Sequence, residues 1–226
     1  DDANGDVTVT VEVLDGNGGT AEQDFTLTVT EVNDVPVANA SSFSTNEDTE
    51  GSTTLTGNDG DPWSSTVDDQ DLTFAIVSGV SNGTLSLNAS TGDVTYDPDD
   101  DFNGSDSFTF TVTDDGTTDG SSDALVSSTA TVSITVNAVN DVPTLTTINA
   151  QETSEETDIT VDLSGSDVDI ATNGQTLTFT ATSSDPSLVA VSTTSTGSST
   201  ATLSLDVQDD ANGDVTVTVE VSDGNG

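Results

Sequence analysis

The sequence repeats itself, and this restricts the folds open to it more than any other feature does. Residues 1–18 recur as residues 209–226 with a single substitution. A shorter period is also present, because residues 32–36 (VNDVP) return as residues 139–143. Repeats spaced about 105 residues apart predict a linear array of small related domains, each with its own core.

Short alternating runs lie between these repeated segments. Thr alternates with Val, Ile, Leu or Phe, and Gly, Asn and Asp separate the runs. A period of two predicts half-buried antiparallel strands. Seven or so short strands in a hundred residues predict an all-β fold, a row of antiparallel Greek-key β-sandwiches. The predicted strands are 7–13, 25–29, 72–76, 84–87, 108–112, 130–136, 177–181, 201–207 and 215–221.

The repeat also predicts where the domains divide. Residues 1–33 supply the last two strands of one domain, residues 34–141 form a complete domain, and residues 142–226 lack a final strand. The strand that is lacking should resemble residues 25–29. We therefore expect the natural protein to continue in both directions, because a sandwich without its last strand exposes its edges and core.

The charge of the chain is entirely negative. It has 42 Asp and Glu residues and no Lys, Arg or His, which gives a formal charge of −42. Nucleic acid and anionic membranes are excluded as partners, since both bind through basic side chains. No membrane-inserting segment is present. An enzyme is not expected, because no His, Cys or Lys is available for nucleophilic catalysis and chance pairs of carboxylates are inevitable here.

Some of the acids recur at equivalent points of each repeat. They lie in the linker, early in the domain, in an Asp-x-Asp pair and after the penultimate strand. Loops at the ends of sandwich strands gather at the two poles, so these oxygen ligands can converge around a linker. Calcium takes six to eight such ligands, whereas an isolated surface Asp is usually only solvated. The recurring positions are Asn33 and Asp34 with Asn140 and Asp141, Glu47 with Glu155, Asp59 and Asp61 with Asp167 and Asp169, and Asp114 with Asp223.

Four motifs resemble one family. Glu47-Asp48-Thr49, Tyr96-Asp97-Pro98, residues 102–108 (FNGSDSF) and residues 139–143 stand in the order typical of bacterial cadherin-like tandem repeats. Such repeats occur in giant secreted adhesins of the RTX type. The resemblance covers residues 34–143 strongly and is weaker beyond, where Tyr-x-Pro is absent. It implies tandem cadherin-like sandwiches in an extracellular, surface-attached stalk for cell adhesion or biofilm formation.

The resemblance also implies Ca²⁺ at the domain junctions, with neighbouring repeats of the same chain as partners. Ala138 stands where a first linker carboxylate is expected, so the later junction should hold fewer or weaker ions. The implied ligands of the later junction are Glu47, Asp106, Asn140, Asp141, Asp167, Asp169 and Asp223. Those of the earlier junction are Glu31, Asn33, Asp34, Asp59, Asp61 and Asp114, and Glu155 repeats the position of Glu47.

Two alternatives to a calcium-stiffened stalk remain. Trp63 lies in an Asp- and Ser-rich insertion, residues 61–71, and an aromatic residue there could face a sugar of an extracellular polysaccharide. The chain could also be a subunit of a self-assembling extracellular filament that joins like fibres through unpaired strand edges.

Overall fold

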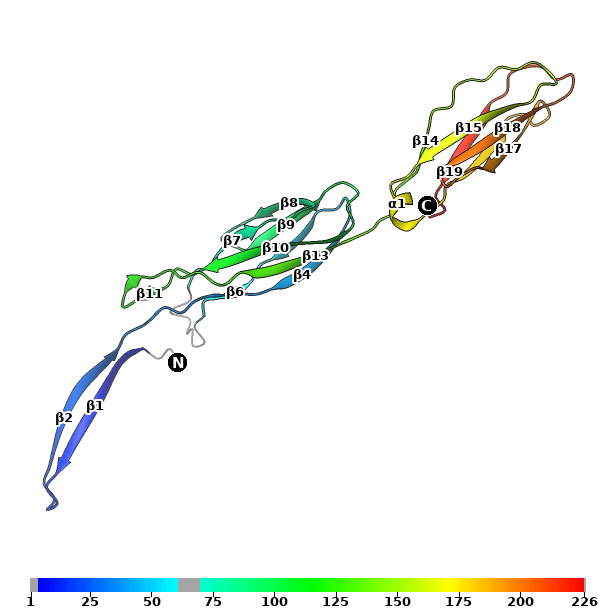
Figure 1. The fold of residues 1–226 in the computed structure, drawn as a ribbon. Helices are drawn as coiled ribbons and strands as arrows, with labels where there is room; N and C mark the ends of the chain where they lie inside the picture. Colours follow the sequence, from blue (N-terminus) through cyan, green and yellow to red (C-terminus); the bar gives the residue numbers. More distant parts are fainter. Residues whose placement is uncertain (1–3, 61–69, 226) are drawn as a thin grey trace. The chain divides into compact units, whose positions relative to one another are not determined.

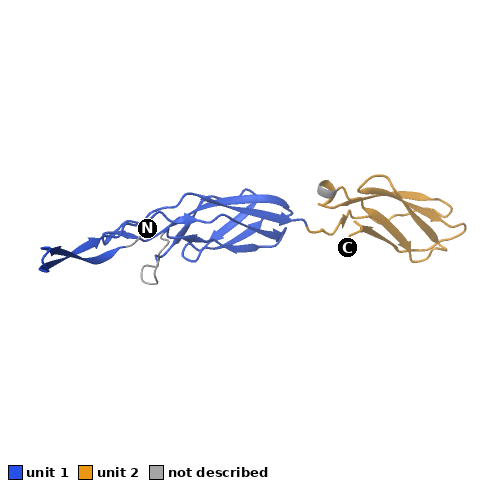
Figure 2. Cartoon of the chain, turned by 90° about the horizontal axis from the view of Figure 1, so that it is seen from below, with its two compact units in different colours: residues 1–138 blue, residues 139–226 orange. Residues whose placement is uncertain are grey.

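The computed structural model describes residues 4–60 and 70–225. The chain divides into two compact units, Asp1–Ala138 and Val139–Gly226, coloured separately in Figure 2. The regular secondary structure of each unit is almost wholly strand (Figure 1). The two units are described one after the other.

Residues 34–138 of unit 1 form a β-sandwich. One sheet has the order β4-β13-β10-β7, and the other has the order β5-β9-β8. Two short pairs, β3 with β6 and β11 with β12, complete it. The strands of the larger sheet are β4 (Ser41–Asn46), β13 (Ala130–Asn137), β10 (Gly104–Thr113) and β7 (Thr73–Ser78). The others are β5 (Gly51–Thr54), β9 (Asp93–Pro98), β8 (Gly83–Leu87), β3 (Val37–Ala38), β6 (Gly57–Asn58), β11 (Thr117–Thr118) and β12 (Ser121–Ser122).

Strand β13 occupies the middle of the larger sheet. It pairs antiparallel with β10 and parallel with β4. The β4 pairing is the one parallel pairing among the described strands, so the prediction of antiparallel strands misses this edge. The chain first forms β3, which pairs with β6, and only then enters the larger sheet as β4. There β4 runs parallel to β13, the last strand of the domain.

The core of unit 1 follows the alternation of the sequence. Every second residue of β13 is buried, with Val132 fully buried and Ile134 1% exposed, while the Thr and Ser residues between them face outward. Tyr96 of β9 is also fully buried, and its hydroxyl donates to the carbonyl of Asn82 at 2.7 Å. Burial, with Asp106 nearby, raises the pKa of Tyr96 to about 12. The core residues are Leu55, Phe74, Val94, Tyr96, Phe108, Phe110, Val112, Ala130, Val132, Ile134 and Val136.

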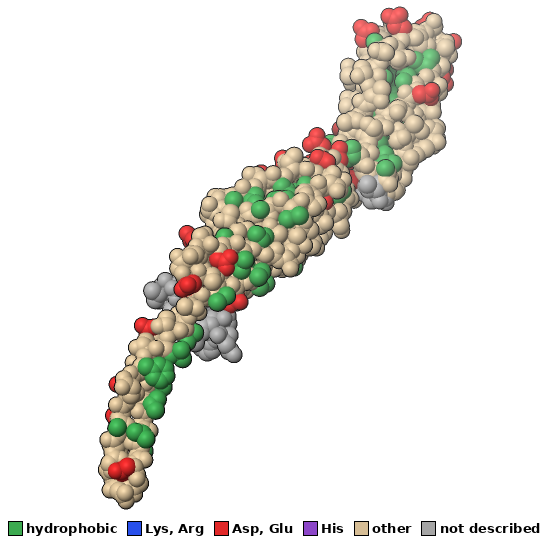
Figure 3. Space-filling model, turned by 60° about the vertical axis from the view of Figure 1, so that its left-hand side comes forward, with side chains coloured by type: hydrophobic (Ala, Val, Ile, Leu, Met, Phe, Trp, Pro, Cys, Tyr) green, Lys and Arg blue, Asp and Glu red, His purple; other side chains and the backbone are tan. Residues whose placement is uncertain are grey.

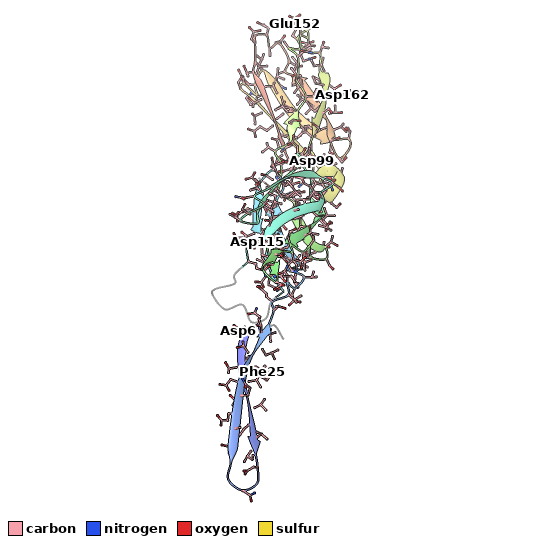
Figure 4. All side chains as sticks on the ribbon, turned by 90° about the vertical axis from the view of Figure 1, so that its left-hand side faces the viewer. Asp6, Phe25, Asp99, Asp115, Glu152 and Asp162 are labelled. Atoms are coloured by element: carbon pink, nitrogen blue, oxygen red, sulfur yellow. The ribbon has the colours of Figure 1, made fainter. Side chains whose placement is uncertain are left out.

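Two strands precede this sandwich. β1 (Gly5–Leu14) and β2 (Thr20–Val29) pair antiparallel as a long hairpin, with Val9 opposite Phe25. Figure 3 shows hydrophobic side chains gathered along this hairpin, and Figure 4 labels Phe25 on it. Phe25 and Leu27 are each 51% exposed. The hairpin therefore has a hydrophobic face that the described residues of the chain leave largely uncovered.

Unit 2 has a second, smaller sandwich. One sheet has the order β14-β15-β18-β17, and β16 pairs with β19 in the other. A single helical turn, α1 (Ile170–Asn173), ends at Gly174 in the left-handed conformation. The described residues include no helix long and apolar enough to cross a membrane. The strands are β14 (Thr144–Leu145), β15 (Ile159–Ser166), β16 (Thr178–Ser183), β17 (Val189–Ser195), β18 (Thr200–Val207) and β19 (Val217–Ser222). The buried core is Leu163, Leu177, Phe179, Ala201, Leu203 and Leu205.

Unit 2 repeats part of the pairing pattern of unit 1. Phe179 lies opposite Val221 as Phe74 lies opposite Val112, so β16 and β19 correspond to β7 and β10. No described strand of unit 2 takes the position that β13 holds in unit 1. Each of the nine runs predicted from the sequence overlaps a strand, although the runs at 72, 177 and 215 begin one or two residues before β7, β16 and β19. The prediction of an all-β fold is confirmed.

Candidate metal centre

Asn33, the linker residue before the sandwich of unit 1, is 7% exposed and bonded on every side. Its backbone N–H donates to the Thr118 hydroxyl at 3.0 Å. Its amide nitrogen donates to Asp114 Oδ1 at 3.1 Å and to the Asp123 carbonyl at 2.9 Å. Its amide oxygen accepts from Gln70 Nε2 at 3.0 Å. These bonds anchor the linker to the domain that follows it.

Asp114 follows the end of β10 and is only 3% exposed. Its Oδ1 accepts from the backbone N–H of Leu125 at 2.8 Å as well as from Asn33. Its Oδ2 is buried and has no hydrogen-bond partner among the described residues, and the same is true of Gln70 Oε1. A buried carboxylate oxygen without a donor costs free energy unless a cation neutralises it. This donor set, oxygen atoms from carboxylate and amide groups, fits a hard cation such as calcium.

The loop after β6 lies against the same linker. Asp59 is 8% exposed, and Asp34 of the linker is exposed. Gly60 has a φ of +90°, and a Cβ atom there would lie 2.5 Å from the carbonyl oxygen of Val35, so only glycine fits this close approach. Asp61, the second member of the predicted Asp-x-Asp pair, lies outside the described residues. The structure therefore brings Asn33, Asp34 and Asp114 to one end of unit 1, with Asp59 in the loop beside the linker.

Glu31 joins this end through its backbone. Its carbonyl oxygen accepts from the N–H of Asp119 at 3.1 Å, in the turn between β11 and β12. The side chain is half-buried. Trp63, the candidate sugar-facing residue, lies outside the described residues.

Unit 2 repeats the arrangement with equivalent residues. Asn140 Nδ2 donates to Asp223 Oδ2, and Gln175 Nε2 donates to the amide oxygen of Asn140 at 2.9 Å. The N–H of Asp141 donates to Asp169 Oδ2 at 2.9 Å.

The Asp-x-Asp pair of unit 2 is held in the same place. The N–H of Asp169 donates to Asp167 Oδ1 at 2.8 Å. Asp169 is 4% exposed, and Asp167 Oδ2 is buried without a hydrogen-bond partner among the described residues. The structure thus brings together five of the predicted ligands of unit 2, which are Asn140, Asp141, Asp167, Asp169 and Asp223.

Sequence reasoning missed the two glutamines of these clusters. Gln70 and Gln175 make the same bond, from side-chain nitrogen to linker asparagine oxygen, in the two units. Each stands two residues before a leucine of a repeated Leu-Thr-Phe segment. That shared spacing was the signal in the sequence. It was missed because glutamine carries no charge and the expected ligands were acids and linker asparagines.

Glu47 lies at the other end of the unit 1 sandwich. It is 3% exposed, and its Oε2 accepts from Asn103 Nδ2 at 3.0 Å, just before β10 begins. Asp114 follows the far end of the same strand. Glu155, the equivalent residue of unit 2, is exposed.

Asp106 of β10, a ligand expected from the family resemblance, is hydrogen-bonded within unit 1. Its carboxylate accepts from the backbone N–H groups of Ser81, Asn82 and Ser107 at 2.8–3.1 Å. Burial acts to raise the pKa of Asp106, but these N–H bonds together outweigh it and hold the pKa below its ordinary value. Because both oxygens already hold the turn at Ser81 and Asn82, we leave Asp106 out of the ligand set.

Comparison with known proteins agrees with this architecture. Residues 33–138 match the model of a family described as the bacterial cadherin-like domain. The chain is similar to the protocadherin gammaB4 extracellular domain, at 17% identity and a TM-score of 0.55 over 97% of this chain and 37% of that one. It is also similar to a protocadherin gammaB7 EC3-6 cis-dimer structure, at 17% identity and a TM-score of 0.56 over 95% and 55%.

At this identity the likeness to solved structures shows the fold alone, and the predicted cadherin-like β-sandwich is confirmed. The chain spans about a third to about half of the length of these two structures. The curated proteins include no match to it.

Proposed function

We propose that this chain is a calcium-stiffened extender segment of a large extracellular bacterial surface protein that serves adhesion or builds a surface fibre. The observation that carries the proposal is the buried Oδ2 of Asp114. It has no hydrogen-bond partner among the described residues, and the chain has no Lys, Arg or His to neutralise it. A buried charge without a partner destabilises a fold by roughly several kcal/mol, so a cation bound from solution is the simplest way to neutralise it.

The proposed ligands are the oxygen-bearing residues around each linker asparagine. Asn33 keeps one free lone pair on its amide oxygen after accepting from Gln70, so it can still act as a ligand. Gln70 Oε1 is a neutral ligand that we add to the predicted set. Around unit 1 the set is Glu31, Asn33, Asp34, Asp59, Asp61, Gln70 and Asp114, and around unit 2 it is Asn140, Asp141, Asp167, Asp169 and Asp223. The family resemblance adds Glu47 and Glu155.

Calcium supplies positive charge and a rigid coordination shell. The linker asparagines are already bonded to the following domain through Asp114 and Asp223. An ion that drew the other linker oxygens onto the same loops would reduce the freedom of the linker and relieve the repulsion among acids. Extracellular modules bind calcium at about 10⁻⁴–10⁻³ M, so external calcium fills such sites whereas cytosolic calcium does not.

Small-angle scattering of the whole chain tests this proposal. We expect the distribution of chain dimensions to become narrower in 10 mM CaCl₂ than in EGTA, with MgCl₂ having a weaker effect because magnesium dehydrates reluctantly. Asp114→Asn should reduce the calcium response. Asp99→Asn removes the same charge from an exposed position (Figure 4) and should leave the response unchanged. Identical scattering with calcium and with EGTA would refute the proposal.

A further inference from the structure

A small hairpin of unit 1 lies against the linker that precedes the sandwich. Its strands are β11 and β12, which pair antiparallel and are joined by Asp119 and Gly120 (β11 is labelled in Figure 1). Asp119 has a φ of +50° and Gly120 has a φ of +71°. Left-handed conformations at both central residues are what the type I′ turn of a two-residue hairpin requires, and Asp-Gly favours them. The local sequence therefore builds this hairpin.

The internal repeat marks the hairpin as an addition to the domain. β1 pairs with β2 as β10 pairs with β13. Asp15 after β1 and Asp114 after β10 each accept, through Oδ1, the backbone N–H two residues later. From there residues 15–19 alone turn the chain into β2, whereas residues 114–129 connect β10 to β13. The longer connection contains the hairpin, so its presence needs a reason other than joining two strands.

Three hydrogen bonds join the hairpin and its base to the linker. The backbone N–H of Asn33 donates to the Thr118 hydroxyl at 3.0 Å. The N–H of Asp119 donates to the carbonyl oxygen of Glu31 at 3.1 Å. The amide nitrogen of Asn33 donates to the carbonyl oxygen of Asp123 at 2.9 Å. Every acceptor here is a hydroxyl or a backbone carbonyl, so these three bonds form without a cation.

The hairpin is prepared for this contact by its own bonds. The Thr118 hydroxyl donates its proton to Asp123 Oδ2 at 2.7 Å, which leaves its lone pairs for the N–H of Asn33. The N–H of Asp123 donates to the Gly116 carbonyl at 2.9 Å and closes the base of the hairpin. A Cβ atom at residue 116 would lie 1.9 Å from Asn33 Oδ1. The linker side chain therefore lies directly against the backbone at the base of the hairpin.

The linker of unit 2 uses acceptors of another kind. Asn140 donates to Asp223, and the N–H of Asp141 donates to Asp169, so both acceptors are carboxylates. Carboxylates gathered at a linker repel one another unless a cation lies among them. Unit 1 also has carboxylates at its linker, but it holds the linker with neutral acceptors as well.

We propose that residues 116–123 form a brace that fixes the linker before the sandwich of unit 1 without a metal ion. The calcium response of the chain then comes mainly from the linker before unit 2, and the two linkers differ in what stiffens them. The use of the brace, as stiffness along an extended segment, rests on the proposed function. Its hydrogen bonds do not.

Hydrogen exchange of the whole chain in EGTA, followed by NMR, tests the brace at the N–H groups of Asn33 and Asp119. We expect both to be protected in the wild type. Thr118→Val keeps the shape of the side chain and removes the hydroxyl, so both N–H groups should exchange about tenfold faster, the factor expected for loss of one hydrogen bond. Asp119 keeps its own acceptor in this variant, so faster exchange there reports release of the whole linker.

Two matched variants serve as controls. Thr118→Ser keeps the hydroxyl and should keep the slow exchange of Asn33. Thr117→Val makes the same change on the opposite face of β11 and should leave both N–H groups protected. The N–H groups of β13 should exchange slowly in every variant, which separates release of the linker from unfolding of the domain.

A distance measurement tests the stiffness itself. The chain has no Cys, so Thr26→Cys in β2 and Ser133→Cys in β13 can carry a pair of spin labels across the linker. In EGTA the distribution of distances should be narrow, and Thr118→Val should broaden it. Unprotected Asn33 and Asp119 in EGTA, unchanged exchange in Thr118→Val, or a broad wild-type distribution would each overturn the brace, even where calcium narrows the scattering. A braced linker in EGTA with no effect of calcium on the scattering would support the brace and refute the calcium proposal.

Discussion

Replacing Asp114 by Asn tests whether a buried charge that destabilises the fold without calcium serves to bind calcium. Asp114 is 3% exposed, and Asn retains the Oδ1 acceptor that receives the N–H groups of Asn33 and Leu125. The change removes a buried carboxylate oxygen that has no hydrogen-bond partner among the described residues. Without calcium, we therefore expect the Asp114→Asn protein to be as stable as the wild type or more stable. With calcium the order should reverse.

The size of the reversal follows from binding linkage. At 10 mM calcium and a dissociation constant of about 0.1–1 mM, the native state gains about 1.4–2.7 kcal/mol per site. For a domain of this size, that gain raises Tm by about 6–20 °C. Asp114→Asn should lose most of this rise for unit 1, because the amide nitrogen in place of Oδ2 repels a cation.

Near-ultraviolet circular dichroism is a suitable assay, because the chain's one Tyr and one Trp both lie within residues 1–138 and report on unit 1. Asp223→Asn makes the equivalent change in unit 2 and should leave this signal's calcium response intact. A variant that keeps the full rise in Tm, or that melts far below the wild type in EGTA, would show that Asp114 is not poised for a cation.

Three further predictions concern unit 1. Gly116→Ala would place a Cβ atom 1.9 Å from Asn33 Oδ1, so it should displace Asn33 and weaken calcium binding measured by titration calorimetry. The control is Gly120→Ala, which has open space around the Cβ position but a φ of +71°. It should lower the stability of the fold and leave calcium binding unchanged. Asp106→Asn should destabilise the chain by about 1–3 kcal/mol at pH 7, because its amide nitrogen faces N–H donors. Because the pKa of Asp106 is lowered in the folded state, its carboxylate stabilises the fold above the unfolded pKa of 3.8 and loses this effect as the pH falls through the lower folded pKa. The difference in Tm between the Asp106→Asn protein and the wild type should therefore shrink from pH 5 to pH 2. A difference in Tm that stays constant over this range would contradict the role given to Asp106. Phe110→Ala, at a fully buried site, should cost about 3–5 kcal/mol in urea unfolding, whereas Phe25→Ala, at a site that is 51% exposed, should cost far less.

The alternating pattern identified nine of the nineteen described strands. The Thr and Val alternation of residues 130–136 is enough to predict β13, because burial of one face of a strand requires a period of two. Strands β4, β5, β9, β15 and β17 were missed, as were the five strands of two residues. β4 and β5 have too few apolar residues to show an alternation, whereas β15 does alternate. The pattern could not reveal that β4 runs parallel to β13, since the direction of a neighbour depends on the path of the chain between the layers.

The sequence by itself determined the fold class, the repeat and the acids that recur with it, because periodicity and turn residues are properties of short segments. Tertiary structure alone decided which oxygens lack donors. Asp106 and Asp114 are both aspartates of β10 or its end, yet backbone N–H groups surround one carboxylate and leave one oxygen of the other without a partner among the described residues. That difference depends on loops distant in sequence, at residues 81–82 and 123–125, and on the linker at Asn33. The cost of a buried charge depends on such neighbours, which residue type and spacing do not specify.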